Sequence, residues 1–418
     1  MNDVARRVQR TYLVLILGNT LAASFIWGIN TLFLLDAGLS NFEAFAANAF
    51  FTVGMVVFEI PTGVVADAWG RRMSYLLGTL TLAGATVLYY LLWSFRAPFW
   101  QWAVVSALLG LGFTFFSGAV DAWLVDALHF ADYDGGLEQI FGRAQIVAGA
   151  AMLAGSVAGG FIAQATSLGV PFLVRAGVLG AMFVIAYFLM QDLGFSPAAR
   201  QSPVRAVKDI LDTSLTYGLK NPPVRWLMLA APFISGVGFY AFYAMQPFLL
   251  HLYGNSKAYG VAGLAAAIFA GSQIVGGVLA PRIRALVQRR TSALILGTTA
   301  GAVFLALLGM TQIFWVALVL LVVWGVAAAA VMPIHQAYLN DMIPSAQRAT
   351  VLSFDSLMGS TGGVVVQPIL GRAADVWGYG ASYLIGAGIQ LLAVPFLVRS
   401  RYQHSPADLG ASAPRAAA

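Results

Sequence analysis

The sequence has no cysteine and little charge. The absence of Cys among its 418 residues excludes disulfides, thiolate metal sites and a Cys nucleophile. Four His residues leave little for a metal cluster. Only 10% of the residues are charged and 60% are hydrophobic, against about 25% and about 45–50% in soluble domains. A soluble core rarely grows beyond about 250–300 residues, so a soluble chain of this composition would have no polar surface to face water. These absences argue against a soluble enzyme, a nucleic-acid binder, a secreted disulfide module and a disordered protein.

Charged residues divide the chain into apolar runs that are long enough to cross a bilayer. About 20 apolar residues span a hydrocarbon layer of about 30 Å as a helix, and in lipid every backbone polar group must be satisfied within such a segment. The sequence lacks the alternating segments of about ten residues that a membrane barrel needs. We therefore predict an all-α polytopic membrane protein with twelve transmembrane helices, at residues 11–35, 43–66, 73–94, 98–128, 141–166, 170–190, 225–252, 258–281, 291–311, 313–340, 349–370 and 380–399.

The distribution of positive charge predicts the orientation of these spans. If the N-terminus is cytoplasmic, 19 of the 23 Lys and Arg residues fall on the inner side and 4 on the outer side. Lys and Arg accumulate in cytoplasmic loops. We therefore expect both termini in the cytoplasm and the chain in a bacterial-type inner membrane. The first run is too long for a signal peptide and ends in no small-residue cleavage site, so we expect it to be retained.

The longest break between spans divides the chain into two groups of six. Residues 1–190 form the predicted N-terminal bundle, 191–224 a cytoplasmic linker and 225–399 the C-terminal bundle. Within the linker, Val204, Val207, Leu211 and Leu215 recur at helical spacing, a pattern typical of an amphipathic helix on the membrane surface. Residues 400–418, rich in Ala and Pro, are predicted to be a disordered tail.

Short matches relate the two groups of spans. The Gly-Ser-x-x-Gly of residues 155–159 recurs at 359–363, and residues 122–126 resemble residues 337–341. Arg143 and Arg348 follow at similar distances. Three matches in the same order indicate a duplicated six-helix bundle, which is typical of alternating-access transporters with a site at the repeat interface. Shared small-residue packing is the alternative explanation.

The loop between spans 2 and 3 reads Gly-Val-Val-Ala-Asp-Ala-Trp-Gly-Arg-Arg, residues 63–72. Its glycines permit a tight turn and close helix contact, and Asp67 with Arg71 and Arg72 places charge at the cytoplasmic surface. The loop, with twelve spans around it, resembles the signature loop of the major facilitator superfamily. Val65 and Ala68 depart from the Leu and the basic residue that are usual there. The Glu-Ile-Pro of residues 59–61 is similar to a variant found in some tetracycline-type efflux proteins.

The resemblance implies a gate at the cytoplasmic end. It places Asp67 against the helix that begins near Ala349, where unpaired N–H groups favour an anion, and pairs Arg71 with Asp126. Both contacts would hold the cytoplasmic side shut. A positive-inside anchor without a gating role is the alternative. The predicted gating residues are Gly63, Asp67, Gly70, Arg71, Arg72, Asp126, Arg143, Asp341 and Arg348.

Two further stretches bear on the resemblance. Span 5 partly matches the antiporter motif of the family, with Ser156 at a Pro position and Ala151 at a Gly position. The match favours export, although a packing seam of small residues explains the glycines equally. Residues 371–378, between spans 11 and 12, resemble the signature loop. The predicted topology places this stretch outside, as a packing turn or, alternatively, part of an outer gate.

Ionisable residues inside predicted spans point to function, because a carboxylate near the bilayer centre costs at least about 2.5–3.5 kcal/mol. Asp121 and Glu59 are the predicted proton-coupling carboxylates, and His335 stands near the repeat-related position of Asp121. A fixed ion pair or a buried hydrogen bond is the alternative for each, and Asp355 and Arg175 are weaker candidates. Span 4 lacks the Arg that many antiporters of the family carry.

The predicted substrate wall is aromatic, with few polar groups. In the family fold, helices 1, 4, 7 and 10 line the cavity. Such a pocket suits a lipophilic or planar molecule, although any of these side chains could instead face lipid or a neighbouring helix. The predicted substrate-binding residues are Asn19, Trp27, Asn30, Thr114, Ser117, Phe239, Tyr240, Tyr243, Gln246 and Gln336.

Three functions follow from these features. The first is a proton-coupled exporter of small, partly hydrophobic drugs or metabolites. The second is a proton- or ion-coupled nutrient importer on the same fold. The third, a membrane enzyme or receptor, lacks support because no HExxH, phosphate-binding loop or cofactor fingerprint is present. We expect the protein to bind no metal, no cofactor and no nucleic acid, and to use a proton gradient. We also expect it to be a monomer in the bilayer.

Overall fold

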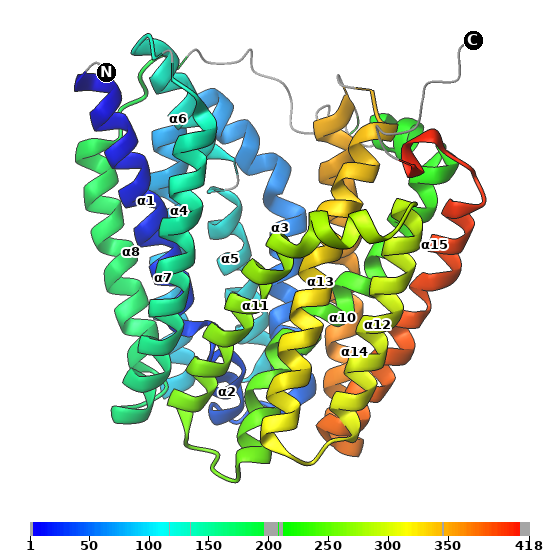
Figure 1. Cartoon of the computed structure of the whole chain (residues 1–418). Helices are drawn as coiled ribbons and strands as arrows, with labels where there is room; N and C mark the ends of the chain where they lie inside the picture. The colour runs from blue at the N-terminus through cyan, green and yellow to red at the C-terminus, as the bar shows by residue number, and fades with distance from the viewer. Residues whose placement is uncertain are drawn as a thin grey trace, which may run out of the picture. The chain divides into compact units, whose positions relative to one another are not determined.

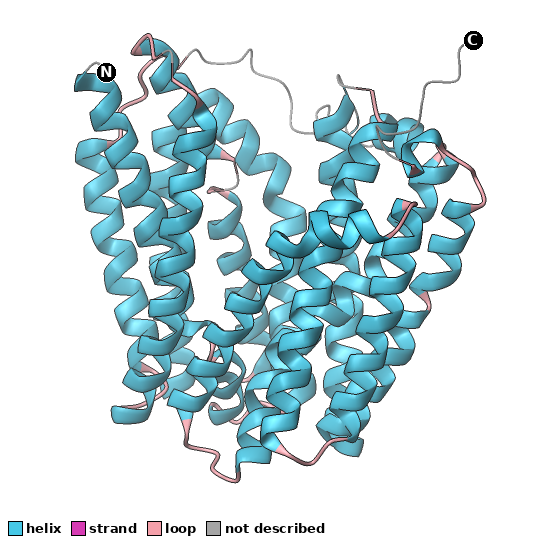
Figure 2. Cartoon of the chain, viewed as in Figure 1, coloured by secondary structure: helices cyan, strands magenta, loops and turns pink. Residues whose placement is uncertain are grey.

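The computed structural model describes residues 3–409 except 117, 134, 196–207, 209–211 and 345–346. Every regular element in these residues is a helix (Figure 2). Eleven helical segments within this described part of the chain are long and apolar enough to cross a membrane. The last, Thr350–Arg401, has 52 residues, or about 78 Å at 1.5 Å per residue. It leaves helical geometry at Gly378 (φ 82°), so it holds two of the twelve predicted spans.

The first compact unit, unit 1, comprises residues 1–39, 50–206 and 255–267. In it α1 packs against α7 and α8, and α4 packs against α5 and α8 (Figure 1). Its helices are α1 (Asp3–Trp27), α2 (Asn30–Asp36), α3 (Asn41–Trp69) from residue 50 on, α4 (Arg71–Ser94), α5 (Phe99–Thr114), α6 (Ala119–Phe130), α7 (Leu137–Ala165), α8 (Val170–Leu189) and the start of α11 (Tyr259–Leu286).

The second compact unit, unit 2, comprises residues 40–49, 207–254 and 268–418. Here α10 packs against α14 and α15, and α12 packs against α13 and α14. Its elements are the first residues of α3, the π-helix η1 (Leu215–Leu219), α10 (Pro222–Tyr253), the rest of α11, α12 (Arg290–Met310), α13 (Phe314–Met342), α14 (Arg348–Leu391), α15 (Ala393–Arg401) and the 3₁₀ helix η3 (Pro406–Asp408).

Each unit has an apolar core and an apolar exterior. Tyr12 and Trp123 are 2% exposed in the core of unit 1, and Tyr338 is fully buried in that of unit 2. Large apolar side chains such as Trp100 and Trp315 are 63% and 70% exposed. Because helices that face hydrocarbon carry apolar residues on their outer surface, this exterior is that of a protein that lies in lipid.

Two predicted spans are interrupted in the structure. The span predicted at 11–35 ends at Trp27 and resumes at Asn30. The span predicted at 98–128 ends at Thr114 and resumes at Ala119, with Gly118 in the left-handed conformation (φ 68°). Gly adopts this conformation readily because it has no Cβ. Hydropathy does not reveal such a turn when the residues on both sides are apolar.

The two segments predicted outside the bundles differ in how much of them is described. In the linker, Val204, Val207 and Leu211 lie outside the described residues, whereas residues 212–219 are helical. Residues 400–409, predicted as the start of a disordered tail, instead hold the end of α15 and the 3₁₀ helix η3, which is a correction, and residues 410–418 lie outside the described residues. Asp408 is 2% exposed there and accepts hydrogen bonds from the backbone N–H and Oγ1 of Thr291 at 2.7 and 2.8 Å.

Candidate substrate cavity and gating loops

Unit 2 encloses a cavity of about 530 Å³ between α10, α12, α13, α14 and α15. Ligand pockets measure about 300–1,000 Å³ and are mostly apolar with a few polar groups, so the cavity has the size and character of a small-molecule site. Its lining residues are Ala231, Ile234, Ser235, Phe239, Leu294, Thr298, Ala328, Val331, Met332, His335, Gln336, Asn340, Leu352, Asp355, Ser356, Gly359, Ser360 and Leu397.

A contact between a histidine on α13 and a carboxylate on α14 lies in the wall of this cavity. His335 Nε2 lies 2.9 Å from Asp355 Oδ2, and the two side chains are 20% and 14% exposed. The other carboxylate oxygen of Asp355 is buried and has no hydrogen-bond partner in the described part of the chain. The pair brings the predicted coupling residue His335 together with the weaker candidate Asp355. It leaves one carboxylate oxygen available to a further donor.

A neighbouring cavity of about 350 Å³ has an aromatic wall. Phe239 lines both cavities, and Phe242, Phe269 and Trp324 line the second. The rings of Phe269 and Trp324 are stacked with centroids 5.6 Å apart, an arrangement that favours contact with planar apolar groups. The aromatic character predicted for α10 and α13 is therefore present in this part of unit 2.

Only some of the predicted substrate residues of α10 and α13 line these cavities. Phe239 and Gln336 do. Tyr240 is 1% exposed, packs against Phe45 and Tyr383, and shares a short hydrogen bond with Ser382. Gln246 is fully buried, and Tyr243 lines neither cavity. Helical spacing alone did not tell cavity-lining from packing positions on α10.

In unit 1 the predicted carboxylate Asp121 lies in the first turn of α6. Its Oδ1 accepts a hydrogen bond of 2.7 Å from the hydroxyl of Tyr12 on α1. Because α6 starts directly after the turn at Gly118, Asp121 occupies a helix N-terminus, where a negative charge is favoured. Glu59, the second predicted carboxylate, is exposed on α3 two residues before Pro61.

Thr114, Ser117 and Asp121 stand at positions i, i+3 and i+7, a spacing that predicts one shared face of a helix, and this prediction is wrong. That face requires a continuous helix, and the chain leaves the helix between Thr114 and Ala119. Thr114 is 3% exposed and its hydroxyl donates to the Leu111 carbonyl of its own helix. Ser117 lies outside the described residues.

The predicted residues of the first span are likewise divided. Asn19 lies on α1 and accepts a hydrogen bond of 2.7 Å from the hydroxyl of Tyr75. Trp27 is the last residue of α1, and Asn30 is the first residue of α2 and 9% exposed. Asn19, Trp27 and Asn30 stand at near-helical spacing in the sequence, but the turn between α1 and α2 means that they do not share one continuous helix.

The signature loop has a network of charged contacts within unit 1. Arg71 Nη1 lies 2.6 Å from Asp67 Oδ1, and Arg71 Nε lies 4.0 Å from Asp126 Oδ2. Arg72 donates to the carbonyl of Tyr187, and its backbone N–H donates to Asp192. The structure thus joins Asp67 directly to Arg71. The placement of Asp67 against the helix from Ala349 stays a prediction.

The remaining predicted gating residues have separate surroundings. Asp341 pairs with Arg290 at 2.6 Å, and an Arg348 guanidinium nitrogen lies 3.5 Å from the Ile343 carbonyl oxygen. Arg143 is exposed on α7. Gly63 lies in α3, and Gly70, between α3 and α4, has φ 102°. Their gating roles stay predictions.

The helix seam of span 5 lies against α1. A Cβ on Gly159 would lie 1.8 Å from the Phe25 carbonyl oxygen, and one on Gly155 would lie 2.2 Å from Ser24 Oγ. Close packing within unit 1 therefore accounts for these two glycines. The antiporter resemblance of the stretch stays a prediction.

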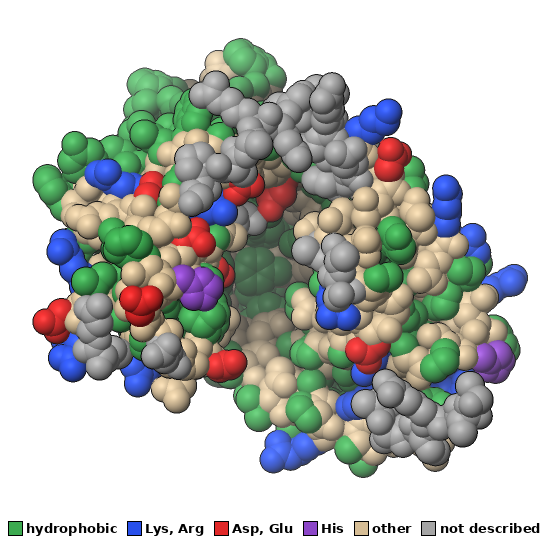
Figure 3. Space-filling model, turned by 90° about the horizontal axis from the view of Figure 1, so that it is seen from above, with side chains coloured by type: hydrophobic (Ala, Val, Ile, Leu, Met, Phe, Trp, Pro, Cys, Tyr) green, Lys and Arg blue, Asp and Glu red, His purple; other side chains and the backbone are tan. Residues whose placement is uncertain are grey.

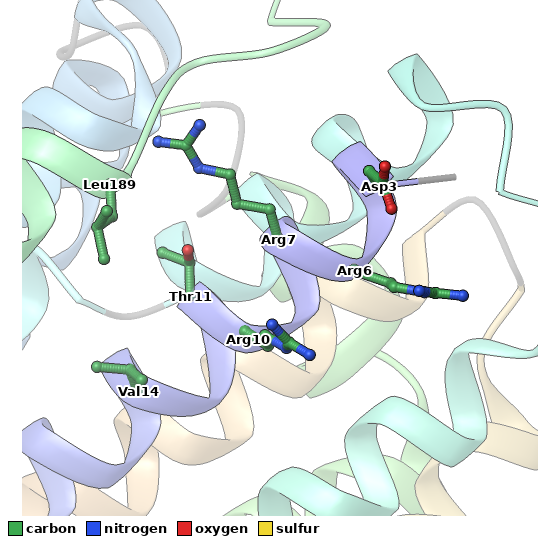
Figure 4. A pocket seen from close by; sticks show the side chains of 7 residues that line it. All are labelled: Asp3, Arg6, Arg7, Arg10, Thr11, Val14 and Leu189. Atoms are coloured by element: carbon green, nitrogen blue, oxygen red, sulfur yellow. The ribbon is translucent and has the colours of Figure 1, made fainter. Parts of the chain in front are cut away.

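A third cavity, of about 390 Å³, lies at the beginning of α1 and is lined mainly by charged side chains. Arg6, Arg7 and Arg10 project around it, with Val14 and Leu189 on its apolar side (Figure 4). Among the described residues, no three His, Asp or Glu side chains come together as metal ligands. Charge at this end of α1 thus consists mainly of exposed cations.

A bundle of apolar helices with a cavity of small-molecule size and charged loops at the helix ends defines a polytopic membrane transporter. The chain belongs to the Major Facilitator Superfamily, whose family model matches residues 12–290 and 285–417. It is a transporter and not an enzyme.

Several known proteins are similar to this chain. The class C tetracycline resistance protein of Escherichia coli is 25% identical over 358 residues, which cover 82% of this chain and 83% of that protein. The multidrug resistance protein MdtG of Salmonella typhimurium is 26% identical over 337 residues, covering 79% and 78%. Among solved structures, the nucleoside transporter NupG superposes with a TM-score of 0.77 at 12% identity over 96% of this chain and 99% of that one. A D-xylose–proton symporter gives 0.69 at 19% identity, covering 95% and 97%. Both of these solved structures have the same fold as this chain.

Apart from Arg71 and Asp126, which the family resemblance pairs, the sequence did not reveal the partners of the charged groups. Tyr12 lies 109 positions from Asp121, and Asp192 lies 120 positions from Arg72. No local pattern marks such pairs, because they depend on how distant helices pack. For the partner of His335, the sequence offered one signal, because Asp355 is an ionisable residue within a predicted span.

Proposed function

We propose that this transporter exports small, partly hydrophobic organic molecules in exchange for protons, by alternating access and without a cofactor. One observation carries the proposal. Among the residues that line the 530 Å³ cavity, His335 and Asp355 alone are ionisable, and their side chains lie within hydrogen-bond distance of each other. The names of the relatives, a tetracycline resistance protein and a multidrug resistance protein, support export.

The pair provides a means of coupling. When His335 carries a proton, the pair has no net charge. When His335 is neutral, Asp355 leaves a charge of −1 in the cavity wall, where few polar groups compensate it. His is the side chain that changes charge most readily near neutral pH. A cationic or hydrogen-bond-donating substrate therefore binds the proton-free form better, and proton entry at His335 weakens its binding.

The cavity walls indicate the kind of substrate. Phe239, Met332 and the stacked Phe269 and Trp324 supply apolar and aromatic surface. Ser235, Gln336 and Asn340 add neutral polar groups. A planar or lipophilic molecule with a basic group complements this combination.

We further propose that both termini face the cytoplasm of a bacterial inner membrane and that the protein acts as a monomer. Arg6, Arg7 and Arg10 lie in the first turns of α1 (Figure 4). Viewed from above, the structure has Lys and Arg side chains along with Asp and Glu side chains on its surface (Figure 3). The excess of Lys and Arg in the loops on the N-terminal side supports this orientation.

Transport by purified protein in proteoliposomes under an imposed pH gradient tests the proposal. Tetracycline and ethidium are the probes, and His335→Gln and Asp355→Asn are the variants. His251→Gln, an exposed His in the last turn of α10, is the matched control. We expect the gradient to drive probe and proton in opposite directions in the wild type and the control, and to have no effect in the two cavity variants.

Two results would count against the proposal. If the gradient drives a probe or a nutrient in the same direction as the proton, the chain is an importer. If His335→Gln keeps the full response to the gradient, the His335–Asp355 pair does not couple transport to protons.

A further inference from the structure

An eight-residue pattern occurs twice in this chain. Residues 63–70 read GVVADAWG and residues 371–378 read GRAADVWG, so Gly, Ala, Asp, Trp and Gly coincide. The backbones agree as well, because the final Gly70 has φ 102° and ψ 154° and the final Gly378 has φ 82° and ψ 168°. Non-Gly residues rarely adopt this conformation. The two copies are therefore two instances of one local structure, each at a point where one helical stretch ends and the next begins.

The Asp of the second copy binds the start of α3. Asp375 Oδ1 accepts hydrogen bonds from the backbone N–H and the side-chain amide of Asn41, and Oδ2 accepts one from the backbone N–H of Phe42, each at 2.9 Å. The first N–H groups of a helix have no partner within it, and its N-terminus favours a negative charge. Asp375 supplies both an acceptor and the charge from 334 positions away.

The surroundings of this contact are also specific. The hydroxyl of Tyr379, directly after Gly378, donates a short hydrogen bond to the side-chain oxygen of Asn41. A Cβ on Gly371 would lie 2.8 Å from the Asn41 carbonyl oxygen and 2.9 Å from the Phe45 ring. The first and last glycines of the pattern thus allow, respectively, the close approach of α14 to α3 and the turn that presents Tyr379. We name Asn41, Asp375 and Tyr379 the α3 latch.

The first copy lies at the end of α3 and the second lies within α14, and each has an Asp that is assigned to the start of the other helix. Asp67 stands at the end of α3, and the family resemblance places it at the start of α14. Asp375 stands at the end of the first part of α14, and its hydrogen bonds are to the start of α3. Because α3 has 29 residues, about 43 Å at 1.5 Å per residue, the two Asp residues belong to opposite membrane faces.

We propose that Asp375 is a positioning residue of the transport cycle: the α3 latch holds the outer end of the transporter closed and breaks when that end opens, as the counterpart of Asp67 at the cytoplasmic end. The inference rests on the alternating access of the proposed function, but not on its substrate, its direction or its coupling ion. An Asp375 that served only to stabilise the helix end would strengthen folding without changing which end is open.

Single cysteines distinguish these roles, since the chain has no Cys of its own. Ala44→Cys reports on the outer end, because Ala44 is fully buried and is the fourth residue of α3. Ser356→Cys reports on the cavity of unit 2, where Ser356 is exposed. Each cysteine is combined with Asp375→Asn, Asp375→Ala or the control Glu43→Gln. Glu43 is a carboxylate of the same helix end, and its hydrogen bonds in the described part of the chain stay within its own turn, from the backbone N–H and Oγ of Ser40. Labelling rates with a maleimide are measured on the full-length protein in membranes.

We expect labelling of Cys at residue 44 to rise roughly two- to thirtyfold in the Asp375 variants, the factor that corresponds to loss of a helix cap, and labelling at residue 356 to fall. Glu43→Gln should change neither rate. Unchanged labelling at residue 44 in Asp375→Asn and Asp375→Ala would overturn the proposal. So would a rise at residue 44 without a fall at residue 356, because local unfolding at the start of α3 exposes residue 44 alone. A rise at both positions would overturn it as well, because that pattern reports general unfolding. Because no substrate is present, failure of the latch and failure of the proposed efflux are separate results.

Discussion

Asp192 accepts a hydrogen bond of 2.9 Å from the backbone N–H of Arg72, so the chain that leaves α8 caps the first turn of α4. Unit 2 has the same arrangement, because Asp408, after α15, accepts from the backbone N–H of Thr291 in the first turn of α12. In both units an Asp residue beyond α8 or α15 therefore accepts a hydrogen bond from a backbone N–H group in the first turn of a helix that comes earlier in the chain.

The titration of Asp192 provides a stability prediction. Burial raises the pKa of this carboxyl above its ordinary value, and it outweighs the opposing effects of the Arg72 amide and the Arg72 and Arg71 charges. A carboxyl with a raised pKa in the folded state contributes stability below its unfolded pKa, and that stability is lost as the pH rises through the folded pKa. Wild type should therefore gain thermal stability relative to Asp192→Asn as the pH falls from about 7 to about 4.

Melting temperatures of detergent-purified protein measure this difference. Asp192→Ala, which removes the acceptor, should lower the free energy of unfolding by about 0.5–2 kcal/mol at neutral pH. A wild type that loses stability relative to Asp192→Asn on acidification would show that the hydrogen bond and the arginines dominate.

Asp408 gives a second stability prediction. It is 2% exposed, bonds to both donors of Thr291, and lies 3.9 Å from an Arg289 guanidinium nitrogen. Asp408→Ala leaves buried donors without a partner and should destabilise the protein by about 1–3 kcal/mol. Thr291→Ala removes one of the two hydrogen bonds and should have a smaller effect.

A double-mutant cycle of these two variants checks that the effects come from the same contact. The combined loss in Asp408→Ala/Thr291→Ala should be smaller than the sum of the single losses, by more than about 0.5 kcal/mol. Additive losses would mean that Asp408 acts through groups other than Thr291.

The span pattern was predictable from the sequence because it depends on composition along the chain. Apolar runs bounded by charge located the transmembrane segments, and residues 349–370 and 380–399 fall on either side of the kink at Gly378. The interruptions at Trp27 and Thr114 were not predicted, because single Gly residues and small polar residues inside an apolar run do not by themselves show where a helix ends. The wrong common face for Thr114 and Asp121 followed directly from the second interruption.

The site was less predictable than the spans. His335 was found as an ionisable residue in an apolar run, but its partner Asp355 lies on another helix. Asp375 was noticed through its resemblance to the signature loop, yet its three hydrogen bonds are to residues more than 300 positions away. Such contacts depend on the packing of helices, which the local sequence does not encode.

The contact between α1 and α7 predicts the effect of adding a single methyl group. A Cβ on Gly159 would lie 1.8 Å from the Phe25 backbone, so Gly159→Ala must separate the two helices and should destabilise the protein by about 1–3 kcal/mol. Gly177→Ala is the matched control, because nothing lies within 4 Å of its added Cβ. Thermal melts should show a loss for Gly159→Ala and no loss for Gly177→Ala. Equal melting temperatures for the two variants would contradict the close approach of α1 and α7.

A variant of the Asp67–Arg71 ion pair distinguishes a gating role of the signature loop from a role as a positive-inside anchor. Asp67 is 51% exposed in its pair with Arg71, and such exposed pairs contribute about 0.2–1 kcal/mol or less. Asp67→Asn should therefore leave the melting temperature nearly unchanged. If Asp67 also acts at the start of α14 during the cycle, the same variant should lower the transport rate at least about tenfold, equivalent to about 1.4 kcal/mol. Glu138→Gln, an exposed carboxylate in the first turn of α7, is the control for loss of charge and should transport normally. Normal transport by Asp67→Asn would leave the loop with the role of a positive-inside anchor alone.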